Sequence, residues 1–184
     1  MTRTLARFVL PLAALLTLVG LAAHASDRTT TLRQVMTDRL VIMIDVARHK
    51  WNTGAPIEDL DREAVVLEAT TERAVAGGVD PDRAAAMVEA QIAAAKIVQF
   101  ALFEQWQAAN AEPFADAPDL VTELRPEISR LTAALIDAVA ATEADLADCT
   151  VHATLAPVPS SLADFPNAWA TAVAGVTDGG TDCG

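Results

Sequence analysis

The sequence predicts an all-α protein built as one domain, because strand signals are missing, alanine is abundant, and apolar residues recur at the helical period along several long segments. Of the 184 residues, 52% are hydrophobic, which is too apolar for a disordered chain. The two cysteines are too few for a disulfide-rich mini-protein. We find no internal repeat and no linker, and therefore expect a single bundle of long helices with a short C-terminal helix.

The chain is acidic, with 13 lysines and arginines against 25 aspartates and glutamates and a formal net charge of −12. Phosphate binding needs clustered cations, so the lack of a basic run argues against nucleic acid as a partner. No Cys/His spacing predicts zinc and no glycine-rich loop predicts a nucleotide site, so we expect neither a metal nor a cofactor. The few cations in this acidic chain are therefore informative.

The N-terminus predicts an export signal. Arg3 and Arg7 precede an apolar stretch of 16 residues that ends near the small-x-small sequence Ala23-His24-Ala25. The stretch is short for a membrane span, although an uncleaved anchor helix is the alternative. We expect residues 1–25 to be a cleaved signal peptide and residues 26–184 to form the mature domain. The mature domain would then lie in the periplasm or outside the cell, without membrane attachment.

Export also permits a disulfide, and two cysteines allow only one intrachain pairing, Cys149 with Cys183. Closing a loop of this length would stabilise the fold by roughly 3–4 kcal/mol. Catalytic thiol chemistry is the rival interpretation, but neither cysteine has a motif around it. We therefore predict a structural disulfide.

Three long helices are expected in the first part of the mature chain. The first covers residues 31–51, where apolar residues recur every three or four positions. The second runs from about residue 59 to residue 76 and ends at Gly77-Gly78. Asp80 is the expected N-cap of the third helix, which covers residues 81–108 with a proline at its first position and is about 40 Å long.

A loop rich in proline and alanine is expected over residues 110–118, followed by a fourth helix that ends near Ala147. Two starts for this helix fit the sequence. It begins either at Asp119, with a kink at Pro126, or at Pro126 itself.

The C-terminal part predicts less regular structure. Residues 151–160 contain prolines and are expected to be a connection, and a short last helix is expected over residues 161–174. Pro166 is a candidate break in that helix. Trp169 is expected to pack this helix against the core.

Two cations lie on the apolar face of the first expected helix. Arg39 and Lys50 are 11 residues apart, close to three helical turns, so both project from the side that faces the bundle. Arg48 lies about 180° from Arg39 around the helix and should be solvated. As an alternative, the long side chains of Arg39 and Lys50 could run along the apolar face and place their charged ends in water. A buried cation without a partner would be costly, so the pair indicates a ligand or a counterion.

The second and third helices add polar side chains to the same interior. Arg62 begins an apolar stripe, with Glu63 beside it near the positive end of the helix. Gln99 lies within the apolar stripe of the third helix, where its amide needs a partner. Gln91 and Lys96 flank this stripe and are expected at its rim. We interpret the set as a cationic pocket for a small anion, with a purely structural polar network as the alternative.

These positions belong to a longer pattern of runs: Arg39-Leu40, Val46-Ala47-Arg48-His49-Lys50-Trp51, Pro56-Ile57-Glu58-Asp59, Arg62-Glu63, Gln91-Ile92, Gln99 and Trp106. The interval from Arg39 to Lys50 is 11 residues, and that from Lys50 to Arg62 is 12. Over about residues 31–106 this pattern resembles the all-helical chorismate mutases of the AroQ class, specifically their exported gamma subclass. The late cysteine pair is also similar to that subclass, whose members are often dimers, so a homodimer is left open.

The resemblance implies an isomerase that converts chorismate into prephenate in a pocket within each chain, without a cofactor. Chorismate carries two carboxylates, which guanidinium and ammonium groups can hold in a compact reactive pose. Negative charge grows on the ether oxygen as its C–O bond breaks, and donors placed there stabilise the transition state. The implied roles are ether-oxygen donation by Lys50 and Gln99, carboxylate binding by Arg39 and Arg62, and binding of the ring hydroxyl by Glu63 with Asp59.

The exported subclass supplies a further arginine from its fourth helix. Arg125 is the expected counterpart, Arg130 is the rival, and an ordinary surface charge is the alternative for both. The chain departs from the family at Ala95, where a small hydroxyl residue is usual. The alternative function is a weakened or inactive descendant of the mutase fold that binds a carboxylated small molecule or a protein partner.

Overall fold

The computed structural model describes residues 13–177, and the side chains of residues 26–177. All regular elements in that part of the chain are helical, so the prediction of an all-α fold is confirmed. The elements are α1 (Ala13–Thr53), α2 (Leu60–Ala76), α3 (Pro81–Ala108), the π-helical turn η1 (Leu120–Leu124), α4 (Arg125–Thr142), the 3₁₀ turn η2 (Glu143–Asp145), α5 (Cys149–Leu155), the 3₁₀ turn η3 (Ser160–Leu162) and α6 (Pro166–Thr177).

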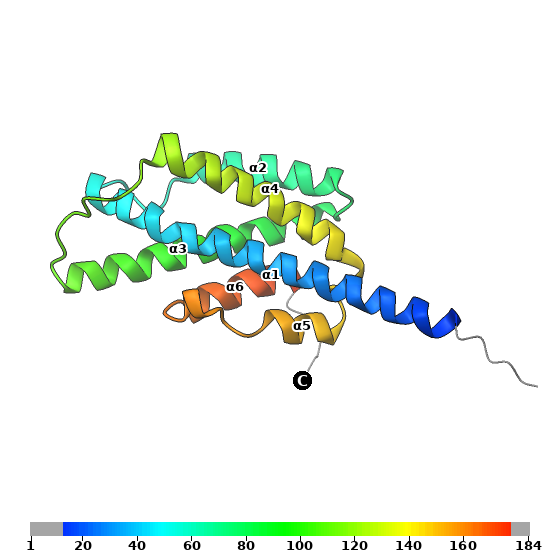
Figure 1. The fold of residues 1–184 in the computed structure, drawn as a ribbon. Coiled ribbons are helices and arrows are strands. Elements are labelled where there is room, and N and C mark those ends of the chain that lie inside the picture. The colour runs from blue at the N-terminus through cyan, green and yellow to red at the C-terminus, as the bar shows by residue number, and fades with distance from the viewer. Residues whose placement is uncertain (1–12, 178–184) are drawn as a thin grey trace, which may run out of the picture.

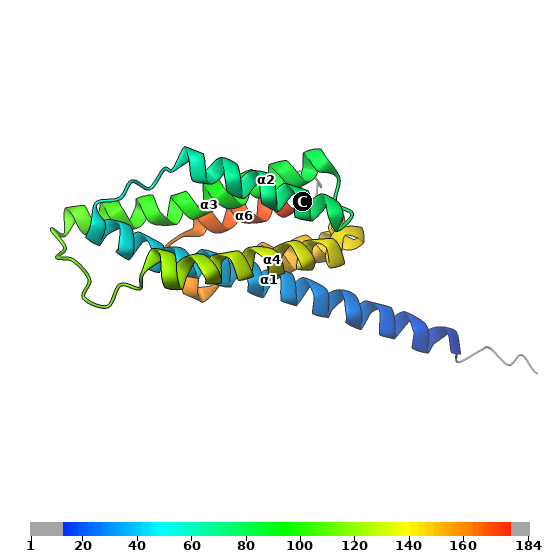
Figure 2. The same cartoon turned by 90° about the horizontal axis from the view of Figure 1, so that it is seen from above.

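The four long helices pack lengthwise. α1 contacts both α3 and α4, and α2 also contacts both of them, so these helices enclose a common interior (Figures 1 and 2). α6 packs along α3, and α5 packs against α1 (Figure 1). The N-terminal part of α1 extends past the end of the bundle in both views.

α1 begins well before the residue 31 expected for the first helix, because no proline follows Pro11 before the end of the helix. Residues 1–12 of the expected signal peptide lie outside the described residues. The rest of that peptide continues into α1 as helix. The helical conformation of these residues does not test the predicted cleavage after Ala25.

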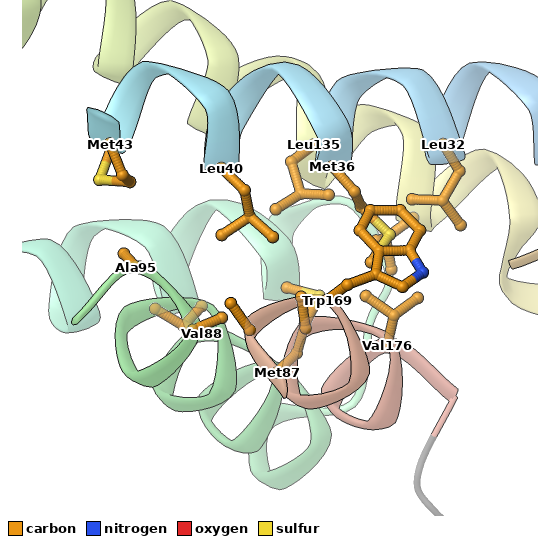
Figure 3. Packing of buried hydrophobic residues seen from close by; sticks show 14 of the residues in the cluster. Leu32, Met36, Leu40, Met43, Met87, Val88, Ala95, Leu135, Trp169 and Val176 are labelled. Carbon is orange, nitrogen blue, oxygen red and sulfur yellow. The ribbon is translucent and has the colours of Figure 1, made fainter. Parts of the chain in front are cut away.

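The core forms where α1, α3, α4 and α6 meet. Trp169 of α6 is 1% exposed, and its indole N–H donates to the carbonyl of Leu155 at 2.9 Å, which confirms its predicted place in the core. Figure 3 shows the packing around it. The labelled residues are Leu32, Met36, Leu40 and Met43 of α1, Met87, Val88 and Ala95 of α3, Leu135 of α4, and Trp169 and Val176 of α6.

α3 is the central helix of this packing. Among the described residues it is the one helix long and apolar enough to cross a membrane by length and composition. Nine of its residues are buried inside the bundle, which accounts for that composition in a core helix. Its inner face is also where the polar residues of the site are held.

Two aspartates explain where α2 and α3 begin, and the cap at Asp80 was predicted. The side chain of Asp59 accepts the backbone N–H of Arg62 at 3.0 Å. The side chain of Asp80 accepts the N–H groups of Asp82 and Arg83 at 3.1 and 3.2 Å, directly before the proline that opens α3. Both helices end at the predicted residues, 76 and 108.

The fourth helix differs from both predicted starts. Asp119 caps it, with its side chain accepting the N–H groups of Val121 and Thr122, and a π-helical turn then leads into α4 at Arg125. This wider turn takes the place of the expected kink at Pro126. α4 ends at Thr142 and not near residue 147, because the chain tightens into the 3₁₀ turn η2.

Two C-terminal predictions are wrong. Residues 149–155, partly assigned to a connection, form α5, which Asp148 caps by accepting the N–H of Thr150 at 2.8 Å. The prolines that suggested a connection all lie after this short helix. The last helix begins at Pro166 and not at residue 161, because proline suits the first turn of a helix, where its missing N–H costs no hydrogen bond.

Candidate active site

A cavity of about 160 Å³ opens between α1, the start of α2, the inner face of α3, and the turn that leads into α4. Seven predicted site residues line it, although they are spread over more than 80 positions of the sequence. They are Arg39 and Lys50 of α1, Asp59, Arg62 and Glu63 around the start of α2, Gln99 of α3, and Arg125 at the start of α4.

Arg39 is a buried cation without a carboxylate partner. Its side chain is 4% exposed, and its guanidinium donates to the carbonyl of Gln91 at 3.2 Å and to the hydroxyl of Thr132 at 3.4 Å. Burial lowers the pKa of Arg39 from 12.5 to about 10. Because desolvation disfavours its charged form, an anion in the cavity would be a favourable partner.

Lys50 lies further along the same face of α1 and is half-buried. Its ammonium donates one hydrogen bond to the carbonyl of Ile57 at 2.8 Å, which leaves two N–H groups for a ligand. Burial lowers the pKa of Lys50 below its ordinary 10.5, against the attraction of Asp59 and Glu63. Lys50 is therefore a cation that loses its proton at a lower pH than a surface lysine does.

Gln99 presents a buried amide from α3. One of its N–H groups donates to the carbonyl of Ala95 at 3.1 Å, and the same nitrogen contacts the sulfur of Met43 at 3.9 Å. Thioether sulfur is a weak acceptor, so the second N–H is poorly satisfied. The side-chain oxygen of Gln99 has no hydrogen-bond partner. A buried amide in this condition can donate to a ligand that enters the cavity.

The start of α2 brings a carboxylate to the cavity. One oxygen of Glu63 accepts the backbone N–H of Asp59 at 3.4 Å, and the other accepts the ammonium of Lys96 at 2.9 Å. Lys96 also lies 3.6 Å from Glu58. Lys96 was expected at the rim of the stripe and lines the cavity.

The structure separates the two candidate arginines of the fourth helix. Arg125 lines the cavity and is half-buried. Arg130 does not line it. Its side chain is 64% exposed and is paired with Glu127 at 2.8 Å. Arg48, expected on the outer face of α1, also lies away from the cavity, where it is only partly exposed and forms ion pairs with Asp45 and Asp116.

The expectation that Gln91 lies at the rim is wrong. It is 1% exposed, and its amide N–H donates to the carbonyl of Ala172 in α6 at 2.9 Å. Its backbone carbonyl is one of the two acceptors that hold Arg39. The position of α6 along α3 decides this burial, and the periodicity of α3 alone cannot reveal it.

No functional role was predicted from the sequence for Lys96 or for Thr132. The signal for Lys96 was available: it lies three residues before Gln99 and so shares a face of α3 with it. Thr132 had no such signal, since its contact with Arg39 depends on how α4 packs against α1.

The cavity is cationic although the chain is acidic. Two carboxylates and five cations line it: Asp59, Glu63, Arg39, Lys50, Arg62, Lys96 and Arg125. The sequence contains only two lysines, and both are in this set. Among the described residues, no group of three or more His, Cys, Asp or Glu could hold a metal ion. The arrangement is suited to binding a small organic dianion and to donating hydrogen bonds inside it.

Comparison with known proteins connects this fold and cavity to one enzyme family. Residues 28–100 match the family model for chorismate mutase type II. Along 81% of this chain and 98% of its own, the crystal structure of a chorismate mutase from Burkholderia thailandensis superposes with a TM-score of 0.70 at 36% sequence identity. The protein is thus an all-helical bundle of the mutase type. It belongs to the type II chorismate mutase family.

Curated relatives match over a shorter length. A secreted chorismate mutase from Mycolicibacterium smegmatis is 34% identical over 102 residues, which are 55% of this chain and 56% of the relative. A monofunctional chorismate mutase from Enterobacter agglomerans is 32% identical over 111 residues, which are 59% of each chain. The chain thus spans little more than half the length of these curated relatives.

Proposed function

We propose that this protein is a chorismate mutase, which rearranges chorismate into prephenate in the cavity between α1, α2, α3 and α4. The observation that carries the proposal is the buried Arg39 guanidinium, which has no carboxylate partner and shares one cavity with Lys50 and Gln99. A dicarboxylate would supply the missing counterion. The family membership supports this substrate class.

Substrate binding would depend on the arginines. Arg39 at the buried end of the cavity and Arg62 at its exposed end would each bind a carboxylate. Arg125 would add a third cation from the start of α4. Fixing both carboxylates holds the flexible substrate in the compact form that reacts, so its conformational freedom is lost on binding and not in the chemical step.

Lys50 and Gln99 would stabilise the transition state. Each has an N–H group that the protein leaves without a strong acceptor. As the ether bond of chorismate breaks, charge accumulates on the ether oxygen, and both donors bind this charge more strongly than the neutral ether. Glu63, with Asp59 beside it, would accept a hydrogen bond from the ring hydroxyl.

The direct test is the loss of chorismate absorbance when purified protein is added. We expect a rate well above the spontaneous rearrangement, with prephenate as the product. A rate equal to the spontaneous one would reject the enzyme proposal. Thermal stabilisation by a dicarboxylate in such a silent protein would then identify a binding protein built on the mutase fold.

We also propose that the protein is exported after cleavage behind Ala25, with the mature chain in the periplasm or the medium. The secreted relative from Mycolicibacterium smegmatis supports export. We further propose the disulfide between Cys149 and Cys183; Cys183 lies outside the described residues, and no cysteine within them is free. Intact mass of the exported protein tests both: it should begin at Ser26 and gain about 2 Da on reduction.

A further inference from the structure

Lys96 connects α3 to the start of α2 through Glu63. Its ammonium lies 2.9 Å from one Glu63 oxygen and 3.6 Å from Glu58, while the other Glu63 oxygen accepts the N–H of Asp59. Both side chains of the closer pair are 23% exposed, so the pair is largely shielded from water. Glu63 is thereby held by two donors, one from α3 and one from the N-cap residue of its own helix.

The Lys96–Glu63 pair also lies at a boundary between two cavities. A second cavity of about 250 Å³ lies between α2 and α3, and it shares Glu63, Ile92 and Lys96 with the cavity of the candidate active site. Glu63 therefore has open space on two sides and would be free to turn between them without its partner. The ion pair with Lys96 restrains this carboxylate at the boundary between the two cavities.

Charge gives Lys96 a second role. A carboxylate in the wall of the cavity repels an incoming dianion, and Glu63 is one of only two such groups in that wall. Among the five cations there, Lys96 is the one that forms an ion pair within the described part of the chain. Lys96 thus cancels the charge of Glu63, while the other four cations are left for the ligand.

We propose that Lys96 is a positioning residue of the active site: it orients the Glu63 carboxylate toward the substrate and offsets its repulsion of a dicarboxylate. This inference rests on the proposed mutase function. It predicts that Lys96 acts on substrate affinity through Glu63, without touching the reacting bonds.

Kinetics of Lys96→Met and Lys96→Arg test the proposal. We expect Lys96→Met to raise KM about tenfold and to change kcat by less than about threefold, because repulsion weakens binding more than chemistry. Lys96→Arg keeps the cation and should recover most of the affinity. A loss confined to kcat, or an unchanged KM in Lys96→Met, would overturn the proposal.

A double-mutant cycle separates action through Glu63 from direct action. In a Glu63→Gln background the charge of Glu63 is no longer there to neutralise and only the longer contact of Lys96 with Glu58 remains, so Lys96→Met should raise KM by at most a third of its effect in the natural protein. An equal effect in both backgrounds would overturn the positioning role. Arg73→Met is the control, since Arg73 forms a pair between helices with Asp137, at 3.0 Å, more exposed than the Lys96–Glu63 pair and away from the cavity. It should leave KM unchanged.

A spectroscopic readout is independent of activity. Because the chain has only two lysines, protein labelled with ¹³C at the lysine ε-carbon gives two signals. The hydrogen bond to Glu63 raises the pKa of Lys96 above 10.5, whereas burial lowers the pKa of Lys50. Glu63→Gln should bring the titration of Lys96 down toward 10.5, and an unmoved titration would overturn the pairing. If the natural protein proves inactive, the proposed function and the positioning role both fail, and this titration still shows whether Lys96 and Glu63 are paired.

Discussion

Two arginines in the interior of the bundle, Arg83 of α3 and Arg39 of α1, show how this protein treats a buried guanidinium. Arg83, at the start of α3, is 13% exposed and donates to Glu143 at 2.8 Å and to the carbonyl of Val176 at 2.8 Å. Arg39 is more deeply buried and finds only a carbonyl and a hydroxyl. The chain supplies a counterion where the arginine joins helices and supplies none where it borders the cavity.

A second comparison lies within α1 itself. Arg33 precedes Arg39 by six residues, and its guanidinium donates to the carbonyls of Thr154, Leu155 and Pro157 and lies over the ring of Trp169 at 5.1 Å. Those contacts satisfy the end of α5 and fasten it to α1. Of the two arginines, Arg39 is the one that borders the cavity and has an incomplete set of partners, as expected if a ligand completes it.

The largest effect is expected from Lys50→Ala. Removing one donor to the developing oxyanion should lower kcat by about 10²–10³. Circular dichroism should show unchanged helix content, since Lys50 makes a single hydrogen bond to the fold. Arg48→Ala, on the opposite face of α1, is the control and should stay within about threefold of the natural rate. Equal losses in the two variants would contradict the assignment of inner and outer faces.

Arg39→Met and Arg83→Met should change stability in opposite directions. Arg39→Met removes an unpaired buried cation, so we expect the Tm to rise by about 2–4 °C while activity is lost. Arg83→Met leaves Glu143 unpaired and should lower the Tm by roughly 4–8 °C with activity retained at 25 °C. Differential scanning calorimetry measures both. A Tm that falls in Arg39→Met would mean that the guanidinium is structural.

Arg125→Ala should raise KM by about tenfold, the effect of losing one partly exposed carboxylate contact. Its control is Arg130→Ala, which removes a surface pair with Glu127 and should change KM by less than about twofold. Steady-state kinetics with chorismate decide between them. The reverse ranking would assign the fourth-helix cation to Arg130.

The smallest effect concerns alkaline pH. Lys50 is cationic below its pKa, and burial places that pKa below 10.5; the pKa of Arg39 is lowered to about 10. We therefore expect kcat/KM to be full below this range and to fall as the pH rises toward 10. Lys50→Arg should remove the part of the fall that comes from Lys50, because a guanidinium keeps its proton to higher pH than an ammonium, and the part that comes from Arg39 should remain. A flat profile up to pH 10.5 would show that neither proton is needed.

Much of the fold could be predicted because its signals are local. Asp80 caps α3 as expected, α2 begins next to the expected residue 59, and the helical period of α1 correctly placed Arg39 and Lys50 on its inner face. The failures occurred where local signals compete. Prolines near residues 157–166 concealed α5, and a π-helical turn replaced the expected kink before α4.

The candidate site followed the same rule. Residue types and spacing were enough to indicate five of the seven lining residues, because an inward-facing polar side chain on an amphipathic helix is conspicuous in the sequence. Asp59 and Arg125 were predicted from the resemblance to the mutase family. The residues that hydrogen-bond or pair with this set could not be predicted from the sequence. The burial of Gln91, the contact of Thr132 with Arg39 and the pairing of Lys96 with Glu63 each join two helices, and no single helix carries that information.

The sequence by itself determined the helical class, the caps, and which cations face inward, since each depends on neighbours within a few residues along one helix. Only the tertiary structure decided which inward cations obtain a counterion. That outcome depends on which helices pack side by side, and so on contacts between residues far apart in the chain. For Arg83 and Lys96 the packing brings a carboxylate, and for Arg39 it leaves a space of about 160 Å³.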